Sequence, residues 1–213
     1  MEQHYTLEEI KTWERFYRAN FINSLSGFKS ASLIGTINEA GNTNLAIFSN
    51  IVHLGADPAM VGFINRPLAA APHTISNIEK TGVFTINLIS EEMISKAHQT
   101  SAKYAEGISE FDATGFTPQF TETCKAPFVK ESKVKYSAEL MEIIPIKYNN
   151  TFFVIGAIKE VLFEKSLLNP DGFLSLEEAE TIASLGLDAY YRAQLVARYA
   201  YAKPDLEPRL INN

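Results

Sequence analysis

The segments LAIFSNIVH (residues 45–53), AMVGFIN (59–65) and VFTINLI (83–89) decide the fold of this 213-residue chain. Each is short, rich in Ile, Val, Phe and Thr, and bounded by Gly, Asn or Pro, which is typical of β-strands. Residues 148–150 (YNN) join two further strand-like segments, and Asn tolerates the positive φ that a tight hairpin needs. The remaining segments of this kind span residues 30–38, 133–146 and 152–164.

Helices are expected around these strands. Thr6 and Glu9 have the spacing of a capping box, and apolar residues then recur at helical spacing, which predicts an amphipathic helix over about 7–19 lying on the sheet. A helix opening at Thr74 and ending at Gly82 is expected, and another over 91–98. A second capping box at Ser175 predicts a long C-terminal helix over about 175–200.

The order of these elements favours a mainly β fold with peripheral helices. The βαβ alternation of a doubly wound fold is absent, so a barrel or sandwich is expected. No repeat, low-complexity tract or linker divides the chain. We therefore expect residues 1–213 to form a single domain.

Composition limits the classes of function. The chain is 46% apolar and 21% charged, with a net charge of −6 and a pI near 5.3, which argues against broad binding to nucleic acids. No apolar run approaches the roughly 20 residues of a membrane span, and no secretory signal is evident at the start. A single cysteine, Cys124, allows no intrachain disulfide. We expect a cytoplasmic protein that does not act on membranes.

Familiar catalytic motifs are absent from the sequence. It has no P-loop, no G-x-G-x-x-G and no G-x-S-x-G, and its four histidines lack the spacing of metal ligands, so no metal is expected and no catalytic residue can be assigned. Polar residues do interrupt one apolar strand, where Ser49 and Asn50 follow Phe48. Either they bond to the backbone, or they face a polar ring system at the rim of a barrel.

A second polar group lies near the expected helix at residue 74. Arg66 ends a strand, and Thr74 follows one short loop later at the start of that helix. A helix N-terminus offers unpaired N–H groups and partial positive charge, and an arginine can add a bidentate contact, so the pair predicts a phosphate site. The alternative is that Arg66 is a surface charge and Thr74 only an N-cap.

Taken in order, these segments resemble the flavin reductase-like, FMN-binding split-barrel family. The resemblance covers about residues 20–165, and the segment GLDAYYR (186–192) is similar to an ending common in the family. The segments that carry it are NLAIFSN (44–50), PAMVGFINRP (58–67), HTISNIEKTGVFTINL (73–88), SEFDATGFTP (109–118), KAPFVKES (125–132) and FFVIGAIKEV (152–161).

The resemblance implies a six-stranded Greek-key split barrel, a homodimer, and FMN, rather than FAD, across the subunit interface. By position, it implies that the residues bordering the flavin ring and ribityl chain are Ala46, Phe48, Ser49 and Asn50. It implies that the phosphate is held by Arg66, Thr74 and Asn77, and that Lys103 belongs to a loop over the site.

The implied activity is hydride transfer from NAD(P)H to flavin, with reduced flavin passed to a monooxygenase as one outcome. Side chains that could position a nicotinamide are His53, Tyr190, Tyr191 and Arg192, although the tyrosines could equally be packing residues. The alternatives are a non-catalytic FMN-binding protein or electron carrier, and a relative that has lost flavin and binds another small molecule or a protein.

Overall fold

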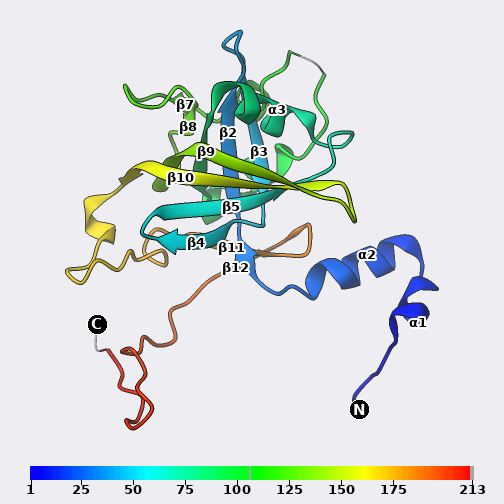
Figure 1. Ribbon diagram of the computed structural model, residues 1–213, viewed down its shortest axis with the longest axis vertical. Helices are drawn as coiled ribbons and strands as arrows, with labels where there is room; N and C mark the ends of the chain where they lie inside the picture. Colours follow the sequence, from blue (N-terminus) through cyan, green and yellow to red (C-terminus); the bar gives the residue numbers. More distant parts are fainter. Residues whose placement is uncertain (106, 212–213) are drawn as a thin grey trace.

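The structure is a computed structural model that describes residues 1–105 and 107–211. Its centre is a seven-stranded antiparallel sheet in the order β3-β2-β6-β9-β10-β5-β4 (Figure 1). The chain is therefore mainly β, as expected. The strands of this sheet are β2 (Ser32–Ile37), β3 (Thr43–Phe48), β4 (Val52–Ala56), β5 (Ala59–Asn65), β6 (Val83–Leu88), β9 (Val134–Ile146) and β10 (Thr151–Phe163).

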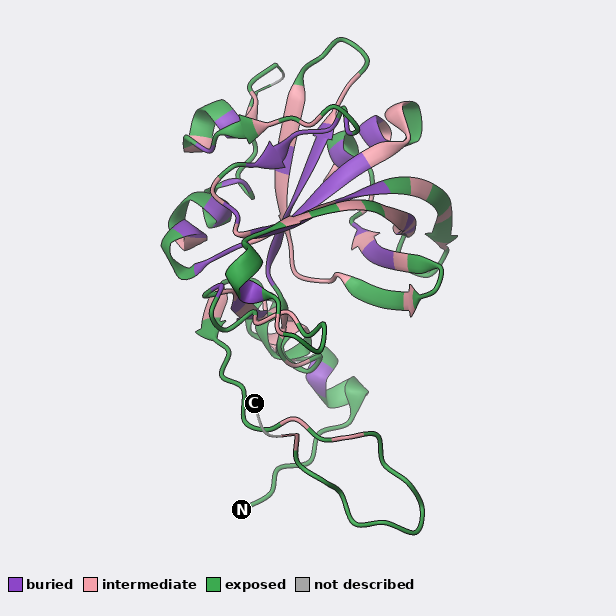
Figure 2. Cartoon of the chain, turned by 90° about the vertical axis from the view of Figure 1, so that its left-hand side faces the viewer, coloured by how far each residue is buried: buried purple, intermediate pink, exposed green. Residues whose placement is uncertain are grey.

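The sheet curls back on itself. Four strands separate β3 from β5, so in a flat sheet these two strands would lie about 24 Å apart. Instead the rings of Phe48 on β3 and Phe63 on β5 meet edge to face, with centroids 5.0 Å apart. Phe84 on β6 packs edge to face on Phe63 at 5.5 Å. The interior of the curled sheet is therefore a closed apolar core, which Figure 2 shows as buried strands.

Asn50 joins the chain just beyond edge strand β3 to β5 across the curled sheet. Its side-chain amide donates to the Ile64 carbonyl oxygen at 3.0 Å and accepts from the Ile64 N–H at 3.1 Å, as a paired strand residue would. The chain leaves β3 after Phe48 and starts β4 at Val52. The single strand expected over 45–53 is thus two strands, and the expected six-stranded sheet has seven.

Several local predictions are confirmed. β9 and β10 form the expected hairpin, with Asn150 at φ 57° in its turn. Gly82 ends α3 (Pro72–Thr81) in the left-handed conformation. The helix expected over 91–98 is present as η1 (Glu91–Met93) continued by α4 (Ile94–Gln99). These features depend on residues that lie close together in the chain, so the sequence is enough to predict them.

The N-terminal helix differs from the prediction. The Thr6 capping box is present, but the helix divides into α1 (Leu7–Lys11) and α2 (Arg15–Ser24), because the Glu14 carboxylate caps a second start by accepting from Phe16 and Tyr17 N–H. Both helices project from the barrel instead of lying on the sheet (Figures 1 and 2). No residue of α2 is buried. We call residues 1–25 the N-terminal arm.

The prediction of a long C-terminal helix is wrong. Ser175 Oγ does accept from Glu178 N–H at 3.4 Å, but the turn ends where Glu180 takes a left-handed φ of 55°. Residues that favour strands follow and form a hairpin that turns at Gly186, φ 63°. This hairpin and the strand at 29–30 make a three-stranded sheet. Its strands are β1 (Lys29–Ser30), β11 (Ile182–Leu185) and β12 (Ala189–Arg192).

The remaining elements are short. The chain beyond β12 runs to residue 211 without helix or strand, and we call residues 193–211 the C-terminal tail. No described helix is long and apolar enough to cross a membrane. The short elements are α5 (Glu110–Thr114), β7 (Pro118–Gln119), β8 (Phe128–Val129) and η2 (Lys165–Leu167).

Candidate functional site

The loop between β5 and α3 is closed by the side chain of Asn65. Its Nδ2 donates to the carbonyl oxygens of Arg66, at 2.8 Å, and Ala71, at 3.1 Å. Because one nitrogen bonds both oxygens, the carbonyl groups of Arg66 and Ala71, at the two ends of the loop, lie close together. Asn65 is fully buried, and its Oδ1 has no partner within the described part of the chain. Asn65 therefore holds Arg66 beside the start of α3.

The start of α3 is an uncapped helix N-terminus. The N-cap residue is Ala71, Pro72 is the first helical residue, and no side chain caps the helix. Thr74 is therefore not the N-cap, as its position had indicated, because Pro72 starts the helix earlier. Backbone N–H groups in the first turn have no partner within their own helix. The Arg66 side chain is exposed and forms no ion pair within the described residues, so this end of α3 carries uncompensated positive charge.

Thr74 and Asn77 face the sheet. The Thr74 hydroxyl accepts from Asn44 Nδ2 at 3.2 Å, and Asn77 Nδ2 donates to Thr36 Oγ1 at 3.1 Å. Asn44 also donates to Thr36, at 3.3 Å. Thr74 and Asn77 are buried, so both side chains secure α3 to β2 and β3. Of the residues predicted to hold the phosphate, Arg66 presents a side chain to solvent, while Thr74 offers its backbone N–H.

The residues predicted to border a flavin surround the end of β3. Ala46 pairs with Ile34 of β2 and is half-buried. Phe48 closes β3 with its ring against Phe63, Ser49 is half-buried just beyond it, and the amide of Asn50 is engaged by Ile64. Asn50 thus shapes the chain at this point through its side chain. The segment 46–50 lies between the core and the edge of the sheet.

Lys103 and the weaker candidates lie elsewhere. Lys103 is exposed in the segment between α4 and α5. His53 is exposed on β4. The other three candidates lie on strand β12, not on a helix. Tyr190 Oη hydrogen-bonds His98 Nδ1 at 2.8 Å, and Arg192 Nη2 donates to Glu91 Oε1 at 2.8 Å. The Tyr191 ring packs edge to face on Phe28, with centroids 4.8 Å apart.

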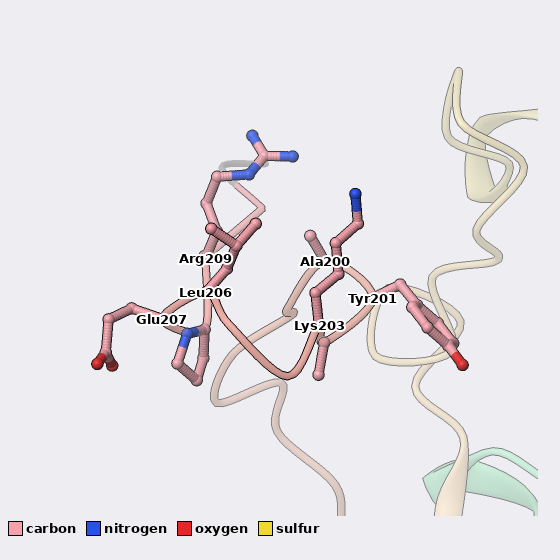
Figure 3. Close-up of a pocket in the computed structure, with 8 residues that line it drawn as sticks. Ala200, Tyr201, Lys203, Leu206, Glu207 and Arg209 are labelled. Carbon is pink, nitrogen blue, oxygen red and sulfur yellow. The ribbon is translucent and has the colours of Figure 1, made fainter.

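Two hollows lie outside this region. One, of about 510 Å³, is formed where the C-terminal tail folds on itself between Ala200 and Arg209 (Figure 3). The other, of about 300 Å³, includes Lys135, whose buried Nζ donates to three oxygens, and burial lowers its pKa. Neither hollow contains a predicted site residue. Among the residues described, no group of three or more His, Cys, Asp or Glu side chains could hold a metal ion.

Sequence reasoning missed two residues that shape the site. Asn65 bonds across its own loop to Ala71, and Glu110 bonds to the Leu45 N–H at 3.0 Å, 65 residues away in the chain. A local pattern contains no signal for the contact of Glu110. For Asn65, the available signal was a polar residue at the end of an apolar strand. The same signal had pointed to Asn50.

Comparison with known proteins gives the family. Residues 26–176 match the flavin reductase like domain, a span that contains the barrel, α3 and every residue predicted to border a flavin or its phosphate. The chain therefore belongs to the flavin reductase like domain family. A protein of *Aquifex aeolicus* is 28% identical over 162 residues, which are 75% of this chain and 82% of that protein.

Solved structures agree on the fold. A candidate flavin reductase with a split barrel domain from *Shewanella frigidimarina* is 48% identical, with a TM-score of 0.91 over 94% of this chain and 100% of that one. Nitrilotriacetate monooxygenase component B of *Bacillus cereus* is 18% identical, with a TM-score of 0.78 over 87% of this chain and 94% of that one. Flavoredoxin of *Desulfovibrio vulgaris* is 22% identical, with a TM-score of 0.69 over 84% and 92%.

Proposed function

We propose that this protein is a cytoplasmic, homodimeric FMN-dependent oxidoreductase that transfers hydride from NADH or NADPH to flavin. The observation that carries the proposal is the family match over residues 26–176, together with the 48% identity to a candidate flavin reductase. When bound, the flavin supplies the redox chemistry, accepting hydride at its ring. The protein supplies binding, orientation and electrostatics.

The start of α3 fits the phosphate of FMN. Its N-terminus has no side-chain cap, and the exposed Arg66 has no carboxylate partner within the described residues. Unpaired N–H groups and a guanidinium are the groups that bind phosphate oxygens. Asn65 brings them together by bonding both ends of the loop. In this proposal Thr74 and Asn77 hold the helix in place, and Thr74 adds its backbone N–H.

The end of β3 fits the flavin ring. Ala46, Phe48 and Ser49 are half-buried at the edge of the barrel, and Asn50 fixes the path of the chain that follows. Lys103 lies in the segment that would cover this region. A half-buried strand edge leaves one side of a flat ring open, as hydride transfer requires, because the donor carbon must approach the flavin to about 3–3.5 Å.

A second copy of the chain is the partner we propose for the homodimer. The N-terminal arm exposes Leu7, Phe16 and Leu25, each at 60% or more of its surface. Apolar side chains in such numbers on a projecting segment mark an interaction surface.

Cytoplasmic location has support from Cys124. It is the single cysteine, it is buried, and burial raises the pKa of its thiol, which is the pattern of an unreactive structural residue. A chain without a disulfide is typical of a reducing compartment.

Turnover of free FMN tests the proposal. Purified protein is mixed with NADH or NADPH and excess FMN, and nicotinamide oxidation is followed by absorbance. The proposal predicts many turnovers per protein chain, and Arg66→Ala should raise KM for FMN by about tenfold, because a charge-assisted bond to phosphate is lost. Lys203→Ala, in the tail hollow, is the control and should leave KM unchanged. A protein that binds no FMN contradicts the proposal.

An electron carrier is the second candidate, since the fold is shared with a flavoredoxin. In that case the same assay gives a stoichiometric burst without turnover. Turnover that rises when a flavin-dependent monooxygenase is added would instead indicate that the protein supplies reduced flavin. The fold shared with a monooxygenase component is the reason to test this role.

A further inference from the structure

Three successive residues of β3 are each secured by another element. The Thr43 hydroxyl is 2.7 Å from that of Ser109, the N-cap of α5. Asn44 reaches Thr74 on α3 at 3.2 Å. The Leu45 N–H donates to Glu110 Oε2 at 3.0 Å. Residues 43–45 therefore connect α3, which starts at the proposed phosphate site, with α5, which follows the segment that carries Lys103.

The bond from Leu45 to Glu110 has a particular place in the sheet. β3 is an edge strand, so the Leu45 N–H has no strand partner on its outer side. Leu45 is fully buried, and an unpaired backbone N–H at a buried position costs free energy. The Glu110 carboxylate satisfies this N–H, and bonds of this charge-assisted type are about twice as strong as neutral ones. Glu110 thereby fixes the edge of β3 immediately before Ala46.

We propose that Glu110 is a positioning residue of the flavin site, acting through the backbone of Leu45. This inference rests on the proposed function. By holding Leu45 to α5, Glu110 sets the course of residues 46–50 and anchors the C-terminal end of the segment that carries Lys103. It does not touch the flavin. It acts on flavin binding by positioning residues 46–50, which border the proposed site of the flavin ring.

The chain contains a second carboxylate that bonds to backbone. Glu131 is half-buried like Glu110, and its two carboxylate oxygens accept from the N–H of Thr117, at 3.0 and 3.2 Å, although Thr117 is exposed whereas Leu45 is buried. Thr117 precedes β7, in the separate two-stranded sheet. Removing either carboxylate frees one backbone N–H. Glu131→Ala therefore controls for the loss of a bond from a carboxylate to backbone at a place away from the proposed flavin site.

The test compares four variants with wild type: Glu110→Ala, Glu110→Gln, Glu110→Asp and Glu131→Ala. FMN affinity is measured by quenching of flavin fluorescence, and exchange of the Leu45 and Thr117 amides by hydrogen exchange. Glu110→Ala should speed exchange at Leu45 and raise the Kd for FMN about tenfold, from the loss of one charge-assisted bond. Glu110→Gln, which keeps an acceptor of the same reach, should stay within about threefold of wild type.

Glu110→Asp keeps the charge but shortens the side chain, so it should weaken FMN binding like Glu110→Ala and serves if the alanine variant does not fold. Glu131→Ala should speed exchange at Thr117 and leave FMN affinity unchanged. Equal FMN affinity in wild type, Glu110→Ala and Glu110→Asp overturns the inference, as does an equal loss in Glu131→Ala. Wild-type protein that binds no FMN overturns the proposed function itself, and the positioning role with it.

Discussion

The barrel and the N-terminal arm are both rich in aromatic residues, but they use them in opposite ways. In the barrel, Phe63 and Phe84 pack edge to face and are completely buried. In the arm, Trp13 contacts Tyr17 and Phe21 edge to face at similar distances, 5.2 and 5.1 Å, yet Tyr17 keeps 65% of its surface exposed. Aromatic contacts alone therefore do not make a core. Burial comes from enclosure by the curled sheet, which the arm lacks.

The largest expected effect is in the barrel. Phe63→Ala should lower the free energy of unfolding by about 3–5 kcal/mol, because it removes a buried ring and leaves a cavity between Phe48 and Phe84. Urea denaturation at pH 7 measures it. Phe16→Ala, in the arm and 70% exposed, is the matched control and, at a protein concentration where the chain is monomeric, should change the same quantity by less than about 0.5 kcal/mol. Similar losses from both variants would break the contrast between the two regions.

A tyrosine in each region gives a pH test of intermediate size. Burial in the barrel raises the pKa of Tyr136 to about 12. Its folded-state pKa lies above the unfolded value of about 10, so its contribution to stability is fully present below pH 10 and is lost as the pH rises through 12. By pH 11 the loss should be about 1 kcal/mol.

Urea denaturation at pH 9 and pH 11 measures this loss. Tyr136→Phe should remove that part of the decline, since phenylalanine has no proton to lose. Tyr17→Phe, in the exposed arm, should decline as wild type does. An identical alkaline decline in wild type and Tyr136→Phe would contradict the expected role of burial.

The smallest effect on unfolding is expected in the arm, where the change should be in assembly instead. The double variant Phe16→Ser, Ile22→Ser removes two exposed apolar side chains and should leave the free energy of unfolding of the monomer within about 1 kcal/mol of wild type. If a second copy covers the arm, the mass in sedimentation should shift toward the monomer, and the melting temperature should lose its dependence on protein concentration. A wild-type protein that is monomeric at all concentrations would contradict the proposed homodimer.

The amino-acid sequence by itself determined the features that depend on neighbouring residues. The β composition of the strands, the turn at Asn150, the left-handed end of α3 at Gly82 and the capping box at Thr6 follow from local preferences for φ, ψ and hydrogen bonds. The ordered series of segments also predicted the family, and with it the location of the candidate site between β3 and α3. Local signals gave the wrong prediction at Ser175, where the expected capping bond to Glu178 forms but is followed by a single turn and not by a helix.

Tertiary structure decided what depends on distant partners. The C-terminal segment became a hairpin because β1 offers its strand a partner more than 150 residues away, a contact that outweighs helix propensity. Asn50 and Glu110 took their roles from backbone groups at Ile64 and Leu45, 14 and 65 residues away in the chain. A side chain that bonds to backbone has no complementary residue type in the sequence, since every residue carries the same N–H and C=O groups. These contacts therefore become visible only once the chain has folded.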